Sequence, residues 1–238
     1  MISNEILFFL WTLVVIGGVL AAFRNGRTAL YGVIGVYIIL ANIFVTKQIT
    51  LFGLAATGGN ALYGSIFLAT DLLSEYWGKR EARRAVWFGW VCALGYLVAS
   101  QAFLLFTPSR DDFVDPAMRT LFSLTPRIIL GSLAAYLASQ THDVWAFHFW
   151  KTRTRGRHLW LRNNASTWVS QAIDTVIFST VAFVGVFPGV VVVQIMITTY
   201  FLKVIVAAVD TPFIYLSRRI KPRELSEAAA AGAGEGTA

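Results

Sequence analysis

The chain has little charge, one cysteine and no motif typical of catalysis or nucleotide binding. Cys92 is its only cysteine, so it can form neither an internal disulfide nor a thiolate metal cluster. Charged residues make up 14% of the sequence, against about 25% in typical soluble domains. GxxxxGKS/T, HExxH and GxSxG are absent, and the three histidines lack metal-binding spacing. We therefore expect no metal, no cofactor and no enzyme, and a P-loop ATPase is excluded.

Long apolar runs fill most of the chain and predict an all-α, polytopic membrane protein. Hydrophobic residues make up 56% of the 238 residues, and the mean hydropathy is +0.62. A helix needs about 20 apolar residues to cross a bilayer. Seven runs of about this length predict a bundle of six to seven transmembrane helices: Ile6–Phe23, Ala29–Thr46, Gly59–Tyr76, Ala85–Phe106, Leu121–Ser139, Ser166–Val186 and Val190–Leu216. The fifth run is the weakest, because polar residues continue past Ser139.

Lysine and arginine gather in alternate connections between these runs. Such residues lie after the first, third, fifth and seventh runs: Arg24 and Arg27, Lys79 to Arg84, Lys151 to Arg162, and Arg218 to Arg223. Cytoplasmic loops of membrane proteins carry this excess, so we expect the N-terminus outside and the C-terminus in the cytoplasm. The net charge of +7 then reflects topology in a lipid bilayer, and no nucleic-acid partner is expected. Residues 1–223 read as one transmembrane domain, and the Ala/Gly-rich residues 224–238 as a disordered tail.

Ionisable side chains interrupt the apolar runs. They are Asp71, Glu75, Arg127, Asp143, Asp174, Lys203 and Asp210. A charge at the centre of a bilayer costs at least about 2.5–3.5 kcal/mol, so such residues pair with each other, face a wet cavity or bind something. The sequence therefore predicts a polar site inside the bundle.

Two interpretations of the third run remain open. Asp71 and Glu75 are four residues apart, which places both carboxylates on one face of a helix. They can face a ligand cavity, or they can form ion pairs: Glu75 with Lys79, and Asp71 with a core cation such as Lys203 or Arg127. The two interpretations are compatible.

A short motif occurs twice on either side of a basic connection. Ser139-Gln140-x-x-Asp143 recurs as Ser170-Gln171-x-x-Asp174, offset by 31 residues, although chance similarity is an alternative. Repeats that converge on a site at the middle of the membrane are common in transporters. Asn163 and Asn164 lie between the copies, and Asn164 or Ser166 could cap the sixth helix.

Several motifs, in this order, resemble one family. They are Ala41-Asn42-Ile43 with Lys47; Thr70-Asp71-x-x-Ser74-Glu75-x-x-Gly78-Lys79; Ala135-Tyr136-x-x-Ser139-Gln140-x-x-Asp143; and Leu159-Trp160-Leu161-Arg162-Asn163-Asn164-x-Ser166-Thr167-x-x-Ser170-Gln171-x-x-Asp174-Thr175. Over roughly residues 41–210 the chain resembles the queuosine precursor transporters of the vitamin uptake transporter (VUT) family. The resemblance implies a bacterial inner-membrane protein that imports 7-deazaguanine bases, such as 7-cyano-7-deazaguanine, for salvage into tRNA modification.

The resemblance also suggests how the polar site is used. A 7-deazaguanine presents an N1–H and an amine side by side, and a carboxylate can accept both. We expect Asp143, Gln171 and Asp174 to form the core of the site. The remaining contacts are expected from Asp71, Glu75 and Gln140, with Asn163 and Asn164 closing the cytoplasmic side.

The sequence leaves the mode of transport open. One alternative is a substrate-binding subunit of an energy-coupling-factor importer, which would require ATPase partners. The preferred precursor, the energy source and the formation of a homodimer are also undetermined.

Overall fold

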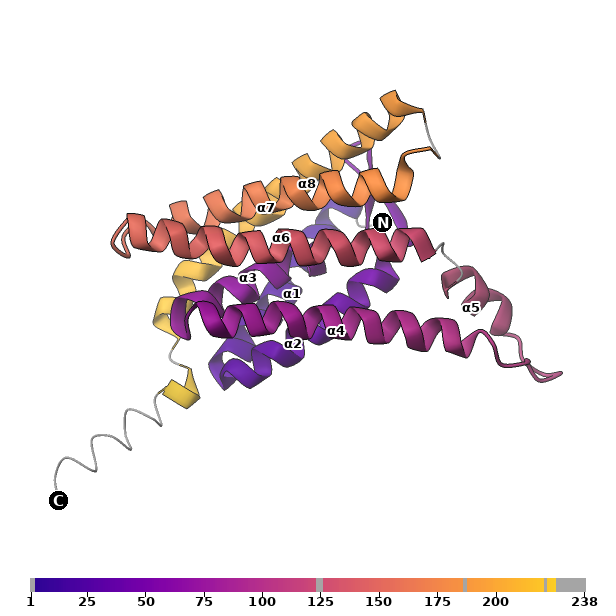
Figure 1. Cartoon of the computed structure of the whole chain (residues 1–238), viewed down its shortest axis with the longest axis horizontal. Helices are drawn as coiled ribbons and strands as arrows, with labels where there is room; N and C mark the ends of the chain where they lie inside the picture. Colours follow the sequence, from indigo (N-terminus) through magenta and orange to yellow (C-terminus); the bar gives the residue numbers. More distant parts are fainter. Residues whose placement is uncertain (1–2, 123–125, 186–187, 221, 226–238) are drawn as a thin grey trace, which may run out of the picture.

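The chain is a bundle of helices in the computed structural model, which describes residues 3–122, 126–185, 188–220 and 222–225 (Figure 1). This confirms the predicted all-α class. The helices are α1 (Asn4–Asn25), α2 (Arg27–Phe44), α3 (Asn60–Tyr76), α4 (Lys79–Phe103), α5 (Asp115–Phe122), α6 (Pro126–Arg153), α7 (Leu159–Phe183) and α8 (Gly189–Leu216), followed by a 3-10 turn at Ser217–Arg219. A small hairpin, β1 (Gln48–Leu51) and β2 (Leu54–Thr57), separates α2 from α3.

Four helical segments are long and apolar enough to cross a membrane, as judged by length and composition within the described residues. They are Asn4–Asn25, Arg27–Phe44, Lys79–Phe103 and Val192–Leu225. The other three long helices, α3, α6 and α7, carry most of the buried polar residues. The chain is thus a multi-pass membrane protein, but this count does not reach the six to seven spans predicted.

Helix α3 lies at the centre of the bundle and packs against α1, α2, α4, α6 and α8. Its side chains from Ala61 to Ser74 are buried, apart from that of Tyr63. Small residues allow its close approach to α8, since a Cβ atom added at Gly64 would lie 2.6 Å from Cγ1 of Val206. Both sides of α3 therefore face protein, and its polar residues meet neighbouring helices.

Two predicted helix boundaries were wrong. Helix α6 continues beyond Ser139 to Arg153, and α7 begins at Leu159 and not near Ser166. Asn164 and Ser166 therefore lie inside α7, whose N-cap residue is His158, and neither of them is a cap. The physical reason is that polar residues of both helices face the protein interior. The apolar run of α6 therefore ends before the helix does, and the apolar run of α7 begins after the helix has started.

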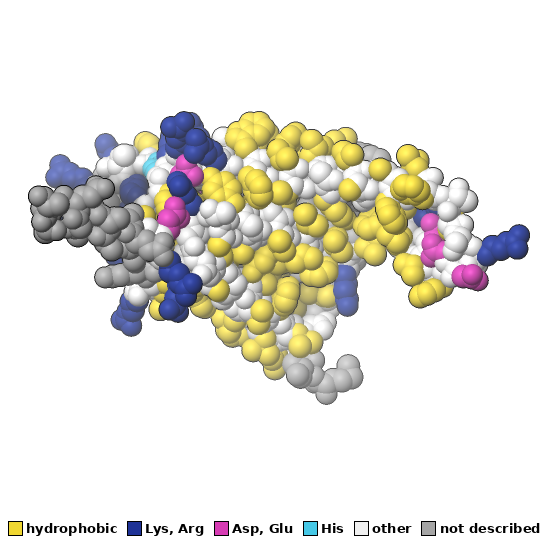
Figure 2. Space-filling model, turned by 90° about the horizontal axis from the view of Figure 1, so that it is seen from below, with side chains coloured by type: hydrophobic (Ala, Val, Ile, Leu, Met, Phe, Trp, Pro, Cys, Tyr) yellow, Lys and Arg dark blue, Asp and Glu magenta, His cyan; other side chains and the backbone are white. Residues whose placement is uncertain are grey.

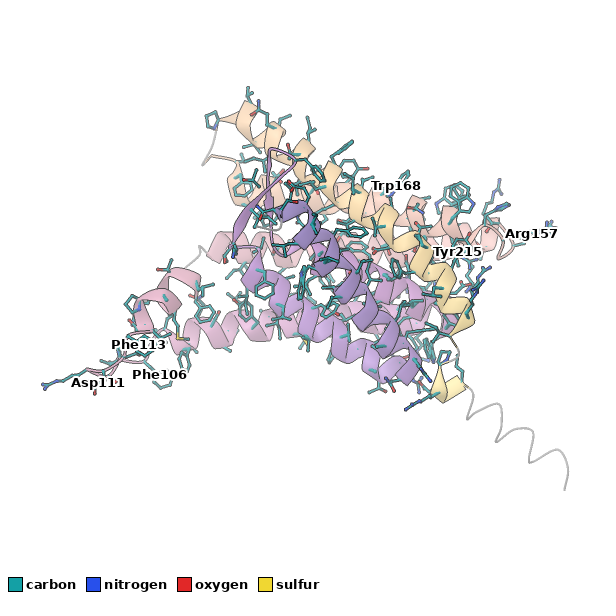
Figure 3. The ribbon with its side chains drawn as sticks, turned by 180° about the vertical axis from the view of Figure 1, so that it is seen from behind. Phe106, Asp111, Phe113, Arg157, Trp168 and Tyr215 are labelled. Atoms are coloured by element: carbon teal, nitrogen blue, oxygen red, sulfur yellow. The ribbon has the colours of Figure 1, made fainter. Side chains whose placement is uncertain are left out.

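The two ends of the bundle differ in charge. Lysine and arginine side chains gather at one end, while hydrophobic side chains cover the middle (Figure 2). Arg157 lies at this basic end, and Phe106, Asp111 and Phe113 lie at the opposite end (Figure 3). In the predicted tail, Glu224 forms an ion pair with Arg27, with Nε and Oε1 2.8 Å apart; residues 226–238 lie outside the described part of the chain.

The hairpin lies at the end opposite to the basic one. Leu51 pairs with Leu54, and the two turn residues between them, Phe52 and Gly53, have φ values of 52° and 75°. Positive φ at both positions is typical of the type I′ turn that suits a two-residue hairpin. The backbone N–H of Phe52 donates to Glu5 at 3.0 Å, which ties the hairpin to the start of α1.

Candidate functional site

Side chains of the repeated motif join α6 and α7. The two helices pack side by side and run in opposite directions (Figure 1). The Ser139 hydroxyl of the first copy donates to Oδ1 of Asp174 in the second, at 3.3 Å. The Ser170 hydroxyl of the second copy lies 2.9 Å from Nδ1 of His142, the residue before Asp143 on α6. Each copy of the motif therefore supplies a serine that contacts the opposite helix, and the serine of the first copy bonds to the aspartate of the second.

Asp174 is the centre of the first polar layer. Its Oδ2 forms an ion pair with the ammonium group of Lys203 from α8. Its Oδ1 accepts a hydrogen bond of 2.5 Å from the hydroxyl of Tyr63 on α3. The Lys203 Nζ lies 5.2 Å from the centre of the Tyr63 ring. The Lys203 ion pair agrees with one of the roles predicted for an intramembrane cation.

A cavity of about 510 Å³ opens beside this cluster. Binding pockets for small molecules have volumes of about 300–1,000 Å³, so a fused two-ring base can be accommodated. Asp174 and Lys203 lie in its wall together with aromatic and amide side chains: Tyr63, Tyr136, Phe178, Asn42, Asn60 and Gln194. Gly53 of the hairpin turn also lines it. The cavity is therefore associated with the end of the bundle opposite to the basic one.

A second polar layer lies deeper along α3, α6 and α8. Asp71, Asp143 and Asp210 are 1%, 0% and 3% exposed. Both carboxylate oxygens of Asp71 and of Asp143 lack a hydrogen-bond partner among the described residues. Helix α3, which carries Asp71, packs against α6 with Asp143 and against α8 with Asp210. Thr70 donates to Oε1 of Gln140 at 3.1 Å, which joins α3 to α6 beside this group.

Gln171 belongs to the same part of the bundle. It lies one helical turn from Asp174 on α7, and its side chain is fully buried. Neither its amide nitrogen nor its amide oxygen has a hydrogen-bond partner among the described residues. Unsatisfied buried amides are rare in folded proteins, because each one gives up its hydrogen bonds with water.

A third layer closes the basic end. The fully buried guanidinium of Arg162 pairs with Glu75 and donates to the carbonyl of Gly156 at 2.9 Å. The Lys151 ammonium lies 2.9 Å from the other Glu75 oxygen. The predicted Glu75–Lys79 pair was wrong, because Lys151 and Arg162 reach Glu75 from α6 and α7.

Two asparagines lie next to this third layer. Asn164 of α7 donates to the Thr211 hydroxyl of α8 at 2.7 Å and to the Trp160 carbonyl at 2.9 Å. Asn163 is 3% exposed, and its side-chain oxygen has no partner in the described part of the chain. Both residues therefore lie at the basic end of the interior, and their closing of a substrate site stays a prediction.

One of the eight predicted substrate-binding residues, Asp174, lines the cavity. The other seven lie in the second and third layers: Asp71, Gln140, Asp143, Gln171, Glu75, Asn163 and Asn164. Their contact with a substrate stays a prediction. For Asp71, the predicted ion pair with Lys203 is not formed, since Lys203 binds Asp174; the side chain of Arg127 lies outside the described residues.

The aromatic wall of the cavity was not predicted. Tyr63, Tyr136 and Phe178 lie in apolar runs, where aromatic side chains are ordinary packing residues, and the sequence holds 34 Phe, Tyr and Trp residues in all. The signal that could have identified Tyr63 is its position eight residues before Asp71. Since α-helices have 3.6 residues per turn, that spacing places it close to the same face of α3.

Comparisons with known proteins agree on one family. The family model described as "Putative vitamin uptake transporter" matches residues 57–217. A "Probable queuosine precursor transporter" of Bacillus subtilis (strain 168) is 42% identical over 200 residues, which cover 84% of this chain and 87% of the relative. The "Queuosine precursor transporter" of Escherichia coli (strain K12) is 32% identical over 145 residues, covering 60% of this chain and 62% of the relative. No solved structure matches the chain.

Proposed function

The chain belongs to the vitamin uptake transporter family, and from this premise we propose that it imports queuosine precursors for salvage into tRNA modification. The substrates proposed are 7-cyano-7-deazaguanine and related 7-deazaguanine bases. The names of the two relatives support this substrate class. Membrane transport, and not catalysis, is the activity proposed.

The proposed setting is the bacterial inner membrane, crossed by six to seven helices. Basic residues at the end of the bundle that holds Arg157 support a cytoplasmic position for that end and for the C-terminus. The N-terminus and the hairpin then lie outside. In this orientation the cavity faces the side from which an imported base arrives, and the ion pairs of Glu75 lie on the cytoplasmic side.

The observation that carries the proposal is the carboxylate–lysine pair in the wall of an aromatic cavity. Asp174 can accept the N1–H and the exocyclic amine of a deazaguanine, and Lys203 can donate to the O6 carbonyl. Tyr63, Tyr136 and Phe178 supply aromatic surface for the flat base. The second and third layers lie behind the cavity, so the proposal gives them no contact with the base in this conformation.

Uptake by the purified protein in liposomes tests the proposal. Labelled 7-cyano-7-deazaguanine should exchange across the membrane, and unlabelled guanine and queuine should be compared as competitors. Asp174→Ala should abolish exchange. Asp115→Ala is the matched control, because Asp115 is an aspartate of the short helix α5, remote from the cavity lining.

Either of two results would contradict the proposal. The first is exchange by Asp174→Ala at the control rate, and the second is no exchange of any 7-deazaguanine by the wild-type chain. Exchange without any ATPase in the liposomes would also exclude the alternative, a substrate-binding subunit of an energy-coupling-factor importer.

A further inference from the structure

Two carboxyl groups meet in the interior of the bundle without a bonded cation. Asp71 of α3 and Asp143 of α6 are buried where these helices pack, and the hydrogen bond from Thr70 to Gln140 joins the same turns of the two helices. None of their four carboxylate oxygens has a hydrogen-bond partner among the described residues. Two buried cations of the bundle form ion pairs with other carboxylates, Lys203 with Asp174 and Arg162 with Glu75. Two carboxylates this close cannot both be ionised without strong repulsion, as in other proteins whose paired aspartates share one proton.

Polar side chains from α3, α6, α7 and α8 surround Asp71 and Asp143. Asp210 of α8 is a third carboxyl group, and Arg162 of α7 is the cation that faces Asp71. The hydroxyls of Ser166, Thr167 and Ser170 lie around Asp143. Gln140, fully buried and bonded to Thr70 through its oxygen, has an amide nitrogen without a partner beside the pair. These unsatisfied groups form a place where a small charged species can be held.

A proton fits this place better than a metal ion. The described residues contain no group of three or more acidic, histidine or cysteine side chains arranged to hold a metal. A proton needs only one carboxylate oxygen to bind and a second to stabilise it, which the pair supplies.

We propose that Asp71 and Asp143 together carry a proton that is transported with the base and drives its accumulation. This inference rests on the proposed function. The proton binds a carboxylate oxygen from the outer side and is released to the cytoplasm, and no covalent bond of the base changes.

The repeated motif supplies a physical link between the two cargoes. Ser139 of α6 contacts Asp174 in the cavity wall, and Asp143 follows it one helical turn later on the same helix. Across the interface, α7 carries both Asp174 and Ser170, whose hydroxyl lies 2.9 Å from Nδ1 of His142, the residue before Asp143. A shift of α6 against α7 therefore changes the surroundings of the base and of the proton together.

Proteoliposomes with a fixed membrane potential and no sodium test the inference. If one proton accompanies each base, an interior one pH unit more alkaline than the outside should raise the inside-to-outside ratio of 7-cyano-7-deazaguanine toward about tenfold. A pH dye trapped inside should report acidification when the base is added outside. Exchange with equal pH on both sides, measured on the same liposomes, tests the proposed function separately.

Asp71→Asn and Asp143→Asn test the assignment to this pair. Each should abolish accumulation in the pH gradient and acidification, whereas Asp115→Asn in the short helix α5 should retain both. The inference is overturned if wild-type exchange ignores the pH gradient, or if a sodium gradient at constant pH drives accumulation. It is equally overturned if both variants still accumulate the base and still acidify the interior.

Discussion

The charge of Lys203 inside the bundle depends on Asp174. Removing one partner of a buried ion pair leaves the other charge uncompensated, which costs about 3–5 kcal/mol, whereas removing both partners can be nearly neutral. We therefore expect Asp174→Asn to lower the unfolding temperature clearly, and the double variant Asp174→Asn/Lys203→Met to recover most of that loss. Thermal unfolding in detergent measures both.

The same pair of variants separates stability from transport. The double variant should remain inactive in base exchange, because it lacks both polar groups proposed to bind the base. Asp115→Asn, in the exposed Asp115–Arg119 ion pair of α5, is the control and should change the unfolding temperature little. A double variant as unstable as Asp174→Asn would show that the ion pair is not what makes that substitution costly.

At the scale of whole helices, close packing of α4 against α6 depends on one glycine. A Cβ atom added at Gly89 would lie 2.2 Å from the hydroxyl of Tyr136, while one added at Gly95, also in α4, would meet nothing within 4 Å. Gly89→Ala should therefore lower the unfolding temperature and weaken binding of the base, because Tyr136 lines the cavity. Gly95→Ala should leave stability unchanged or raise it by up to about 1 kcal/mol, given the higher helix propensity of alanine. Equal behaviour of the two variants would contradict this packing.

Glu75 holds α3, α6 and α7 together at the basic end through Lys151 and Arg162. Glu75→Gln removes the charge that both cations share, and we expect the helices to separate there more often. In a chain with Cys92 replaced, Ser166→Cys tests this, since Ser166 is fully buried on α7. Its labelling by a membrane-impermeant thiol reagent from the basic end should increase several-fold when Glu75→Gln is added. Asp115→Asn is again the control and should leave labelling unchanged.

The positions of the long helices were more predictable from the sequence than their ends were. Apolar composition indicated α1, α2 and α4 because lipid-facing helices are apolar along most of their length. It misplaced the ends of α6 and α7, since Gln140, Asp143 and Asn164 point into protein, where hydropathy is a poor guide. Arg162 was counted among loop residues for the same reason, although its side chain is fully buried.

Across the whole molecule, the polar residues form three successive layers along the bundle. The cavity with Asp174 comes first, the carboxyl pair of Asp71 and Asp143 second, and the ion pairs of Glu75 last. Composition predicted that charged residues would meet inside, because isolated charges in a bilayer are too costly. It could not predict which charges pair, since that depends on how α7 and α8 are positioned against α3.

The order of the layers gives a direction of transport only once the orientation of the bundle in the membrane is known. In cells producing a chain with Cys92 replaced, Phe52→Cys in the hairpin turn should react with an impermeant thiol reagent added outside, because Phe52 is 71% exposed. Arg157→Cys, at the opposite end, should react only after the membrane is opened (Figure 3). The reason is that loops rich in Lys and Arg are found on the cytoplasmic side of membrane proteins. The reverse pattern would place the cavity on the cytoplasmic side. It would contradict the proposal that the cavity receives the base from outside the cell.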